Sequence, residues 1–176
     1  MPDADALQSL LDREAIRECV FRYCRGIDRL DEAALRASYW PDATDCHGAY
    51  RGSATGFVDA ALKSLPKAGR MIHHVGNLSI ELRGAQAAVE TYFLAWQRSP
   101  GADGAQAETF LCGRYVDRFE KRGAEWRVAE RTVVYDWVQP MGPAPAGTEA
   151  ERFGPRTPIG ARKPDDPWYA LLARLD

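Results

Sequence analysis

The chain has 176 residues, of which 45% are hydrophobic and 27% charged, and its formal net charge is -2 at neutral pH. This length and composition are typical of one globular domain whose core is large enough to contain a cavity. Acidic and basic residues are interspersed, which excludes the basic surface that a nucleic-acid partner needs.

Signals for a membrane, for export and for a metal are missing. No apolar run approaches the roughly 20 residues that span a bilayer, and the first residues, MPDADALQ, lack the regions of a signal peptide. We therefore expect a cytoplasmic protein with no membrane partner. The four cysteines have neither CxxC spacing nor a zinc-like arrangement with a histidine, so we expect reduced core cysteines, no metal and no cofactor.

The first third of the chain is predicted to be mainly helical. Apolar residues recur at steps of three and four between Leu7 and Ile27, which indicates an amphipathic helix. Asp31 precedes a second helical stretch, EAALRASY, as its N-cap residue, and Trp40-Pro41 is expected to end that helix. Three elements are expected to follow: short strands around Thr44–His47 and Ala49–Gly52, and a helix over Gly56–Leu65.

Four longer strand-like runs follow Gly69, separated by short turns rich in glycine and polar residues. Such short links require antiparallel neighbours. Helices followed by an antiparallel meander predict an α+β domain with the helices packed on one face of the sheet. The predicted strands are Arg70–Leu82, Ala87–Gln97, Ala107–Lys121 and Trp126–Val138.

Two of these strands need an irregularity to bring their apolar residues onto one face. In the first, the apolar alternation changes parity across Gly76-Asn77, which predicts a β-bulge and a curved sheet. In the last, a similar change near Glu130 would point Arg131 inward. A curved sheet over helices leaves a cone-shaped hollow, so we expect an internal cavity.

Two adjacent histidines make the first of these strands a candidate for chemistry. His73 and His74 must face opposite sides of the sheet, so one can line the interior while the other faces outward. If the sheet covers the first helix, Asp28 near the end of that helix could meet a histidine in a pocket. Position alone also allows a solvated Asp28 and an ordinary packed histidine.

Three stretches carry a resemblance to a known family: GIDRLDEAALRASYWPDAT, IHHVGNLSIEL and GRYVDRFEKRGAEWRVAERTVVYDW. Their order and spacing resemble the SnoaL-like group of the nuclear-transport-factor-2-like superfamily, and within it the scytalone dehydratase, bile-acid 7α-dehydratase and dehydrochlorinase branch. The resemblance implies a cone-shaped α+β barrel, in which a strongly curved, mixed or antiparallel sheet surrounds three N-terminal helices. It also implies an internal active site and a homodimer or homotrimer.

The resemblance divides the chain in two. Residues 1–138 are expected to form the cone domain. Residues 139–176 are rich in proline, glycine and charge and are expected to be an extended tail. An apolar cluster within it, Pro167–Leu172, is expected to dock on its own domain or on a neighbouring subunit.

The resemblance also implies the site residues. His73 matches the histidine general base, and Asp28 matches the aspartate that orients it. Tyr23 matches a tyrosine that would polarise a carbonyl or protonate a departing hydroxyl; the dehydrochlorinase has lysine there, which argues against dehalogenation. Together these roles imply a cofactor-independent lyase of the dehydratase type.

Arg131 matches an arginine of the last strand that would bind an enolate, phenolate or carboxylate oxygen. The alternative is an ion pair across the strands, with Asp117 or Glu130.

The aromatic content suggests the substrate. Five Trp, seven Tyr and six Phe suit a mostly apolar ligand with a few polar groups, so we expect a small aromatic, alicyclic or polycyclic hydroxy compound and a role in aromatic-compound metabolism. The residues predicted to line its site are Phe21, Trp40, Tyr92, Trp96 and Tyr115.

Other functions stay open at this point. The same His-Asp pair would serve a carbon-carbon lyase, such as one releasing formaldehyde from a lignin-derived diol by retro-aldol cleavage, or an isomerase or cyclase. All of these begin by removing a proton and stabilising an oxygen, so the sequence does not separate them. Two non-catalytic alternatives are a small subunit of a ring-hydroxylating dioxygenase and a module that binds an apolar ligand.

Overall fold

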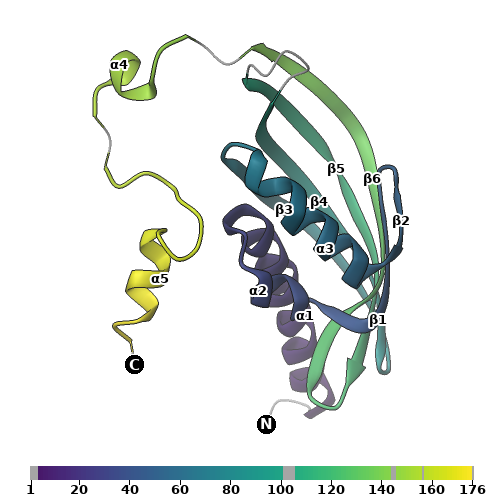
Figure 1. Cartoon of the computed structure of the whole chain (residues 1–176). Coiled ribbons are helices and arrows are strands. Elements are labelled where there is room, and N and C mark those ends of the chain that lie inside the picture. Colours follow the sequence, from purple (N-terminus) through teal and green to yellow (C-terminus); the bar gives the residue numbers. More distant parts are fainter. Residues whose placement is uncertain (1–3, 101–105, 144–145, 156, 176) are drawn as a thin grey trace.

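The computed structural model of the protein describes residues 4–100, 106–143, 146–155 and 157–175 (Figure 1). Helices come first and last, and long strands lie between them. The helices are α1 (Ala4–Arg29), α2 (Glu32–Arg36), α3 (Ala54–Ser64), the 3-10 turn η1 (Leu65–Lys67), α4 (Glu149–Phe153) and α5 (Pro167–Leu172). The strands are β1 (Tyr39–His47), β2 (Tyr50–Ser53), β3 (Met71–Arg83), β4 (Gln86–Pro100), β5 (Gln106–Arg122) and β6 (Glu125–Pro143).

The strands form one open, curved sheet in the order β2-β1-β6-β5-β4-β3, and α1, α2 and α3 lie on its concave side (Figure 1). β1 runs parallel to β6, whereas all other neighbours are antiparallel. The fold is therefore an α+β cone, as the resemblance implies, and its sheet is mixed.

The start of β1 differs from the prediction. The sequence placed Trp40-Pro41 at the end of a helix, but α2 ends at Arg36 and both residues belong to β1. The register between β1 and β6 shifts between Tyr39 and Thr44. Pro41 lies in this shift, so the N–H that it lacks is not needed for the ladder.

Both predicted irregularities are present. The pairing of β3 with β4 shifts between Val75 and Leu78, on either side of Gly76-Asn77. In β6, Val128 pairs with Phe119 and Glu130 pairs with Arg118, so Ala129 is the extra residue of a bulge. This bulge points Arg131 into the core, where it is 1% exposed.

The core lies between α1 and the concave face of the sheet. Ile16, Val20, Tyr23 and Ile27 of α1 are buried, as the predicted stripe requires. Each large apolar side chain removed from water contributes roughly 1.5–3 kcal/mol. Asp31 caps α2 by accepting a hydrogen bond from the Ala34 N–H, as predicted.

The C-terminal segment contacts the junction of α1 and α2 within its own chain. Lys163 Nζ and the Tyr169 hydroxyl donate hydrogen bonds to the Asp31 carboxylate, over 3.0 and 3.1 Å. The Arg25 guanidinium lies 5.3 Å from the centre of the Trp168 ring. Because β6 continues to Pro143, the sheet extends past the boundary expected at residue 138.

Among the helices that the structure describes, none combines the length and the apolar character needed to cross a bilayer.

Candidate active site

The structure brings Asp28 and His73 together. Oδ1 of Asp28 lies 2.7 Å from Nδ1 of His73, and Oδ2 accepts a hydrogen bond of 2.9 Å from the His73 backbone N–H. A carboxylate can only accept, so the Nδ1 atom carries the proton. The other ring nitrogen, Nε2, is then left with a lone pair for a ligand.

The ends of two elements position this pair. Asp28 lies in the last turn of α1, and the chain then turns sharply at Leu30, whose φ is +51°. His73 is the third residue of β3, which packs along α1. The carboxyl end of a helix favours a positive charge. An imidazolium formed at His73 is therefore stabilised by the Asp28 carboxylate and by the end of α1.

His73 of this pair borders a cavity of about 240 Å3, here called the inner pocket. Helices α1 and α3 and strands β1 to β4 contribute to its lining, which includes Tyr23, His47, Phe57, Met71, His73 and Gln97. The lining is mainly apolar and aromatic, with a few polar groups, as ligand sites usually are.

Tyr23 lines the inner pocket, and its ring also packs against Arg131. The Arg131 guanidinium carbon lies 4.1 Å from the centre of the Tyr23 ring. Burial raises the pKa of Tyr23 well above its ordinary value and outweighs the opposing charge of Arg131. The phenol therefore keeps its proton at neutral pH and can act only as a neutral donor or acceptor.

Arg131 lies behind the pocket, not on it. Its Nε and one terminal nitrogen donate to the two oxygens of Asp117, at 2.8 and 2.6 Å, and the side chains of both residues are fully buried. Burial alone would lower the pKa of Arg131, but the Asp117 carboxylate raises it well above the ordinary value. Arg131 is therefore not among the residues that line the inner pocket, and the ion pair with Asp117 that the sequence also allowed is present.

Three of the five expected wall residues point away from the inner pocket. Tyr92 and Trp96 have the opposite parity in β4 to Phe93 and Ala95, so both face outward and are 45% exposed. Phe21 is also 45% exposed, because it follows Val20 by one helical step and leaves the buried stripe.

The other two lie elsewhere in the interior. Trp40 donates to the Glu120 carbonyl and borders a separate groove between β1 and α3. Tyr115 is buried beneath the pocket lining, where its ring stacks on Phe93 at 4.6 Å and contacts Tyr23 edge-on at 5.7 Å.

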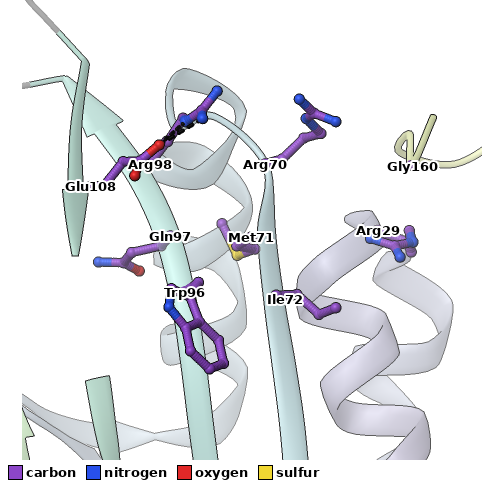
Figure 2. A pocket seen from close by; sticks show the side chains of 9 residues that line it. All are labelled: Arg29, Arg70, Met71, Ile72, Trp96, Gln97, Arg98, Glu108 and Gly160. Atoms are coloured by element: carbon purple, nitrogen blue, oxygen red, sulfur yellow. Dashed lines mark hydrogen bonds and ion pairs between the residues drawn. The ribbon is translucent and has the colours of Figure 1, made fainter. Parts of the chain in front are cut away.

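A second cavity, here called the outer pocket, lies across the edge of the sheet at the start of β3 (Figure 2). Its volume is about 300 Å3, and Ile72 and Trp96 contribute to its lining. Arg98 of its rim is paired with Glu108, as the dashed lines in Figure 2 show. Met71 and Gln97 line both pockets, so they separate the outer pocket from the one that contains His73.

His47 is a pocket residue that the sequence reasoning missed. It lies in the inner pocket, beside Asp45 of the same strand. The available signal was the alternation in Asp45-Cys46-His47, which places a carboxylate and an imidazole on the same side of a strand. Within the described residues, no three His, Cys, Asp or Glu side chains converge as a metal-binding group.

An open, curved sheet with three helices on its concave side and polar groups in an internal pocket defines a cone protein of the nuclear-transport-factor-2-like superfamily. The model of the SnoaL-like domain matches residues 8–132. The chain therefore belongs to the SnoaL-like family. No curated protein matched the chain.

Several solved structures share the fold. A type 2 hexachlorocyclohexane dehydrochlorinase is 22% identical, with a TM-score of 0.71 over 81% of this chain and 99% of its own. A scytalone dehydratase-like protein from Novosphingobium aromaticivorans is 19% identical, with a TM-score of 0.67 over 80% and 96%. A protein described as the β subunit of an aromatic-ring-hydroxylating dioxygenase from the same organism is 21% identical, with a TM-score of 0.57 over 74% and 93%. At these identities the similarity concerns the fold.

Proposed function

We propose that the protein is a cofactor-independent lyase that eliminates water from a small aromatic or alicyclic hydroxy compound. The observation that carries this proposal is the contact of 2.7 Å between Asp28 and His73 at the wall of the inner pocket. An imidazole whose Nδ1 donates to a carboxylate has a basic Nε2, as in the Ser-His-Asp arrangement. Fold neighbours that include a dehydrochlorinase and a dehydratase-like protein support the same class of reaction.

In this reaction His73 removes a proton from carbon, and the Asp28 carboxylate stabilises the imidazolium that forms. The C–H electron pair becomes the new double bond, and the hydroxyl leaves from the neighbouring carbon. Tyr23 keeps its proton, so it can donate a hydrogen bond to a carbonyl or hydroxyl of the substrate.

The size of the inner pocket narrows the substrate. An engineered cavity of ~150 Å3 holds one benzene molecule, so about 240 Å3 accommodates one substituted ring. We therefore propose a one-ring substrate, in place of the polycyclic compounds that the sequence left open.

3-Hydroxycyclohexanone is a suitable first probe, because its loss of water gives a conjugated ketone that absorbs in the ultraviolet. In D2O, deuterium uptake at the carbon beside the carbonyl reports proton removal even when no product leaves. Mass spectrometry of the product and of the remaining substrate would distinguish dehydration from carbon-carbon cleavage and from isomerisation. A panel of one-ring hydroxy ketones extends the test to other substituents.

Substituting either His73 or Asp28 should strongly reduce turnover and leave the fold unchanged. We expect His73→Ala and Asp28→Asn each to lower turnover by about 100- to 10,000-fold, the usual contribution of a general base. His74→Ala is the matched control, since His74 is the adjacent histidine on the outer face and is exposed. Turnover and deuterium uptake within a fewfold of wild type in both variants would refute the mechanism. Tight binding of the probes by wild type without any proton exchange would instead favour a binding module.

A further inference from the structure

A second histidine, His47, faces the inner pocket and has no part in proton removal by His73. Its ring stacks on Phe57 of α3, with centroids 4.4 Å apart, and meets Tyr135 of β6 edge-on at 6.2 Å. Contacts from α3 and β6 therefore hold the ring in place at the end of β1.

Asp45 lies directly behind this ring. Its Oδ2 accepts a hydrogen bond of 2.7 Å from the Tyr39 hydroxyl. Its Oδ1 lies 3.6 Å from Nδ1 of His47, and both atoms are buried with no hydrogen-bond partner among the described residues. Buried polar atoms are rarely left unpaired. A proton on Nδ1 of His47 would face the Asp45 carboxylate over this 3.6 Å, which is an ion-pair contact and longer than a hydrogen bond.

The charges around Asp45 leave this carboxylate without a cation of its own. Arg131 is the buried cation of this cluster, and both oxygens of Asp117 are already hydrogen-bonded to it. The Tyr39 hydroxyl, which also accepts from Arg131 at 3.3 Å, links this pair to Asp45. Two buried carboxylates thus share one guanidinium, and a buried charge without a partner is costly.

The other side chains around His47 do not supply the missing charge. Phe57, Tyr50 and Tyr135, from α3, β2 and β6, are uncharged residues. Burial, with a further contribution from the Asp45 charge, raises the pKa of Tyr135, so this phenol stays neutral. An imidazolium at His47 balances Asp45 and leaves the Nε2–H as a donor.

We propose that His47, protonated and held by Asp45, is the acid of the inner pocket, donating its Nε2–H to a substrate oxygen while His73 acts as the base. This assignment rests on the proposed function. In the elimination, His73 takes the proton from carbon, the C–H pair forms the double bond, and the C–O bond breaks. His47 transfers its proton to the departing hydroxyl, which leaves as water. One proton returned from His73 to His47 through solvent restores both residues.

The test compares two probes of similar shape, 4-nitrophenol and 4-nitrotoluene, which differ in having a hydroxyl or a methyl group at the same position. A hydrogen bond between a charged donor and the phenol oxygen is made only by the first probe. We expect His47→Gln to weaken the binding of 4-nitrophenol by roughly 10- to 100-fold, the usual worth of such a bond. Binding of 4-nitrotoluene should stay within about twofold, which also shows that the pocket is intact. His74→Gln, the matched control, should change neither.

Three outcomes overturn the proposal: an unchanged affinity of His47→Gln for 4-nitrophenol, an equal loss for both probes, or no binding of 4-nitrophenol by the wild type. An equal loss would mean that His47 only shapes the pocket.

Rates of water release and of deuterium uptake separate the role of His47 from the proposed function of the protein. In His47→Gln, release of water should slow while deuterium uptake through His73 persists. Failure of deuterium uptake in the wild type would reject the base mechanism and leave the binding result standing.

Discussion

Arg131 is a buried charged residue around which the centre of the core is packed. Its guanidinium is fully buried, makes a two-point contact with Asp117, and packs against the rings of Tyr23 and Tyr115, whose centres are 4.1 and 4.3 Å away. Desolvating such a charge costs several kcal/mol unless it is paired. The rings that cover it also support the inner pocket, so Arg131 acts on the pocket through packing.

Removing this charge should destabilise the fold strongly. Arg131→Leu leaves the Asp117 carboxylate buried without its partner, and we expect a loss of about 3–5 kcal/mol in the free energy of unfolding. Urea denaturation followed by circular dichroism measures the loss. The double variant Asp117→Leu/Arg131→Leu should recover part of it, because no unpaired carboxylate remains at that position. A double variant less stable than the single one would contradict the idea that pairing is what matters.

The side of the sheet that a single residue faces could be predicted where a face of the sheet could be assigned. The parity of β3 and its bulge indicated which histidine could face α1, and the family resemblance selected Asp28 as its partner. In β4, aromatic or large apolar residues occur at both parities, so the pattern did not tell the outward Tyr92 and Trp96 from the inward Phe93. His47 was missed because Asp45, Tyr39 and Arg131 are brought together only by the pairing of β1 with β6.

At the scale of elements, the close approach of β5 and β6 requires a glycine. A Cβ atom added to Gly113 would lie 2.0 Å from the backbone oxygen of Val134, at a shift in register between the two strands. Backbone cannot move aside as a side chain can.

We expect Gly113→Ala to destabilise the protein by roughly 1–3 kcal/mol or more, as overpacking does. Gly76→Ala is the matched control, since a Cβ at that position in β3 meets nothing within 4 Å. Thermal denaturation of both variants checks the difference. Equal melting temperatures would show that the strands can separate at Gly113 without cost.

The attachment of the C-terminal segment should depend on pH. Burial alone would raise the pKa of Asp31, but hydrogen bonds from Lys163, the Ala34 N–H and Tyr169 lower it below the ordinary value of 3.8. A carboxyl group with a lowered pKa in the folded state stabilises that state above its ordinary pKa and loses this effect as the pH falls through the lowered value. The segment should therefore be held at neutral pH and released below about pH 4.

Hydrogen exchange of residues 162–172, followed by mass spectrometry, measures this release. Asp31→Asn is the informative variant, because asparagine still caps α2 while the charge is removed. We expect lower protection of these amides at pH 7 in this variant, relative to the intrinsic exchange rate at that pH, and little further loss of protection on acidification. Slow exchange in Asp31→Asn at neutral pH would mean that other contacts hold the segment.

The long elements were the most predictable part of the fold. All four long strands and helix α1 were found with ends displaced by a few residues, because strand parity and helical periodicity extend over many positions. The parallel contact of β1 with β6 was not predicted, since β1 is short, contains Pro41 and pairs with residues 86 to 89 positions further along the chain. The pairing of β1 with β6 depends on the curvature of the whole sheet, which no local sequence pattern indicates.

At the scale of the molecule, the convex face of the sheet carries exposed apolar side chains. Ile72, Leu94 and Trp96 of β3 and β4 have the parity opposite to His73, and Trp137 of β6 lies in register with Cys112, the partner of Leu94. These four side chains are between 39% and 69% exposed. An apolar patch of this kind usually marks a surface that another protein covers.

We expect the convex face to bind a second copy of the chain, giving the homodimer or homotrimer that the sequence suggested. Leu94→Glu should then shift the mass measured by light scattering toward the monomer, because it places a charge in the contact. Leu10→Glu makes the same change at an exposed leucine of α1, on the opposite side of the sheet, and should leave the mass unchanged. A monomeric wild-type protein at micromolar concentration would contradict this expectation.

Met71 and Gln97 form the wall between the inner and the outer pocket, so changes at these two residues would change the size of the molecule that the protein accepts. The two cavities on either side of this wall together exceed the room that a single ring needs. Shorter side chains at these two positions would open one continuous chamber, reached from the sheet edge, without changing His73 or His47. If these histidines have the roles proposed above, different residues set the size of the substrate and the chemistry, and evolution can change the first without changing the second.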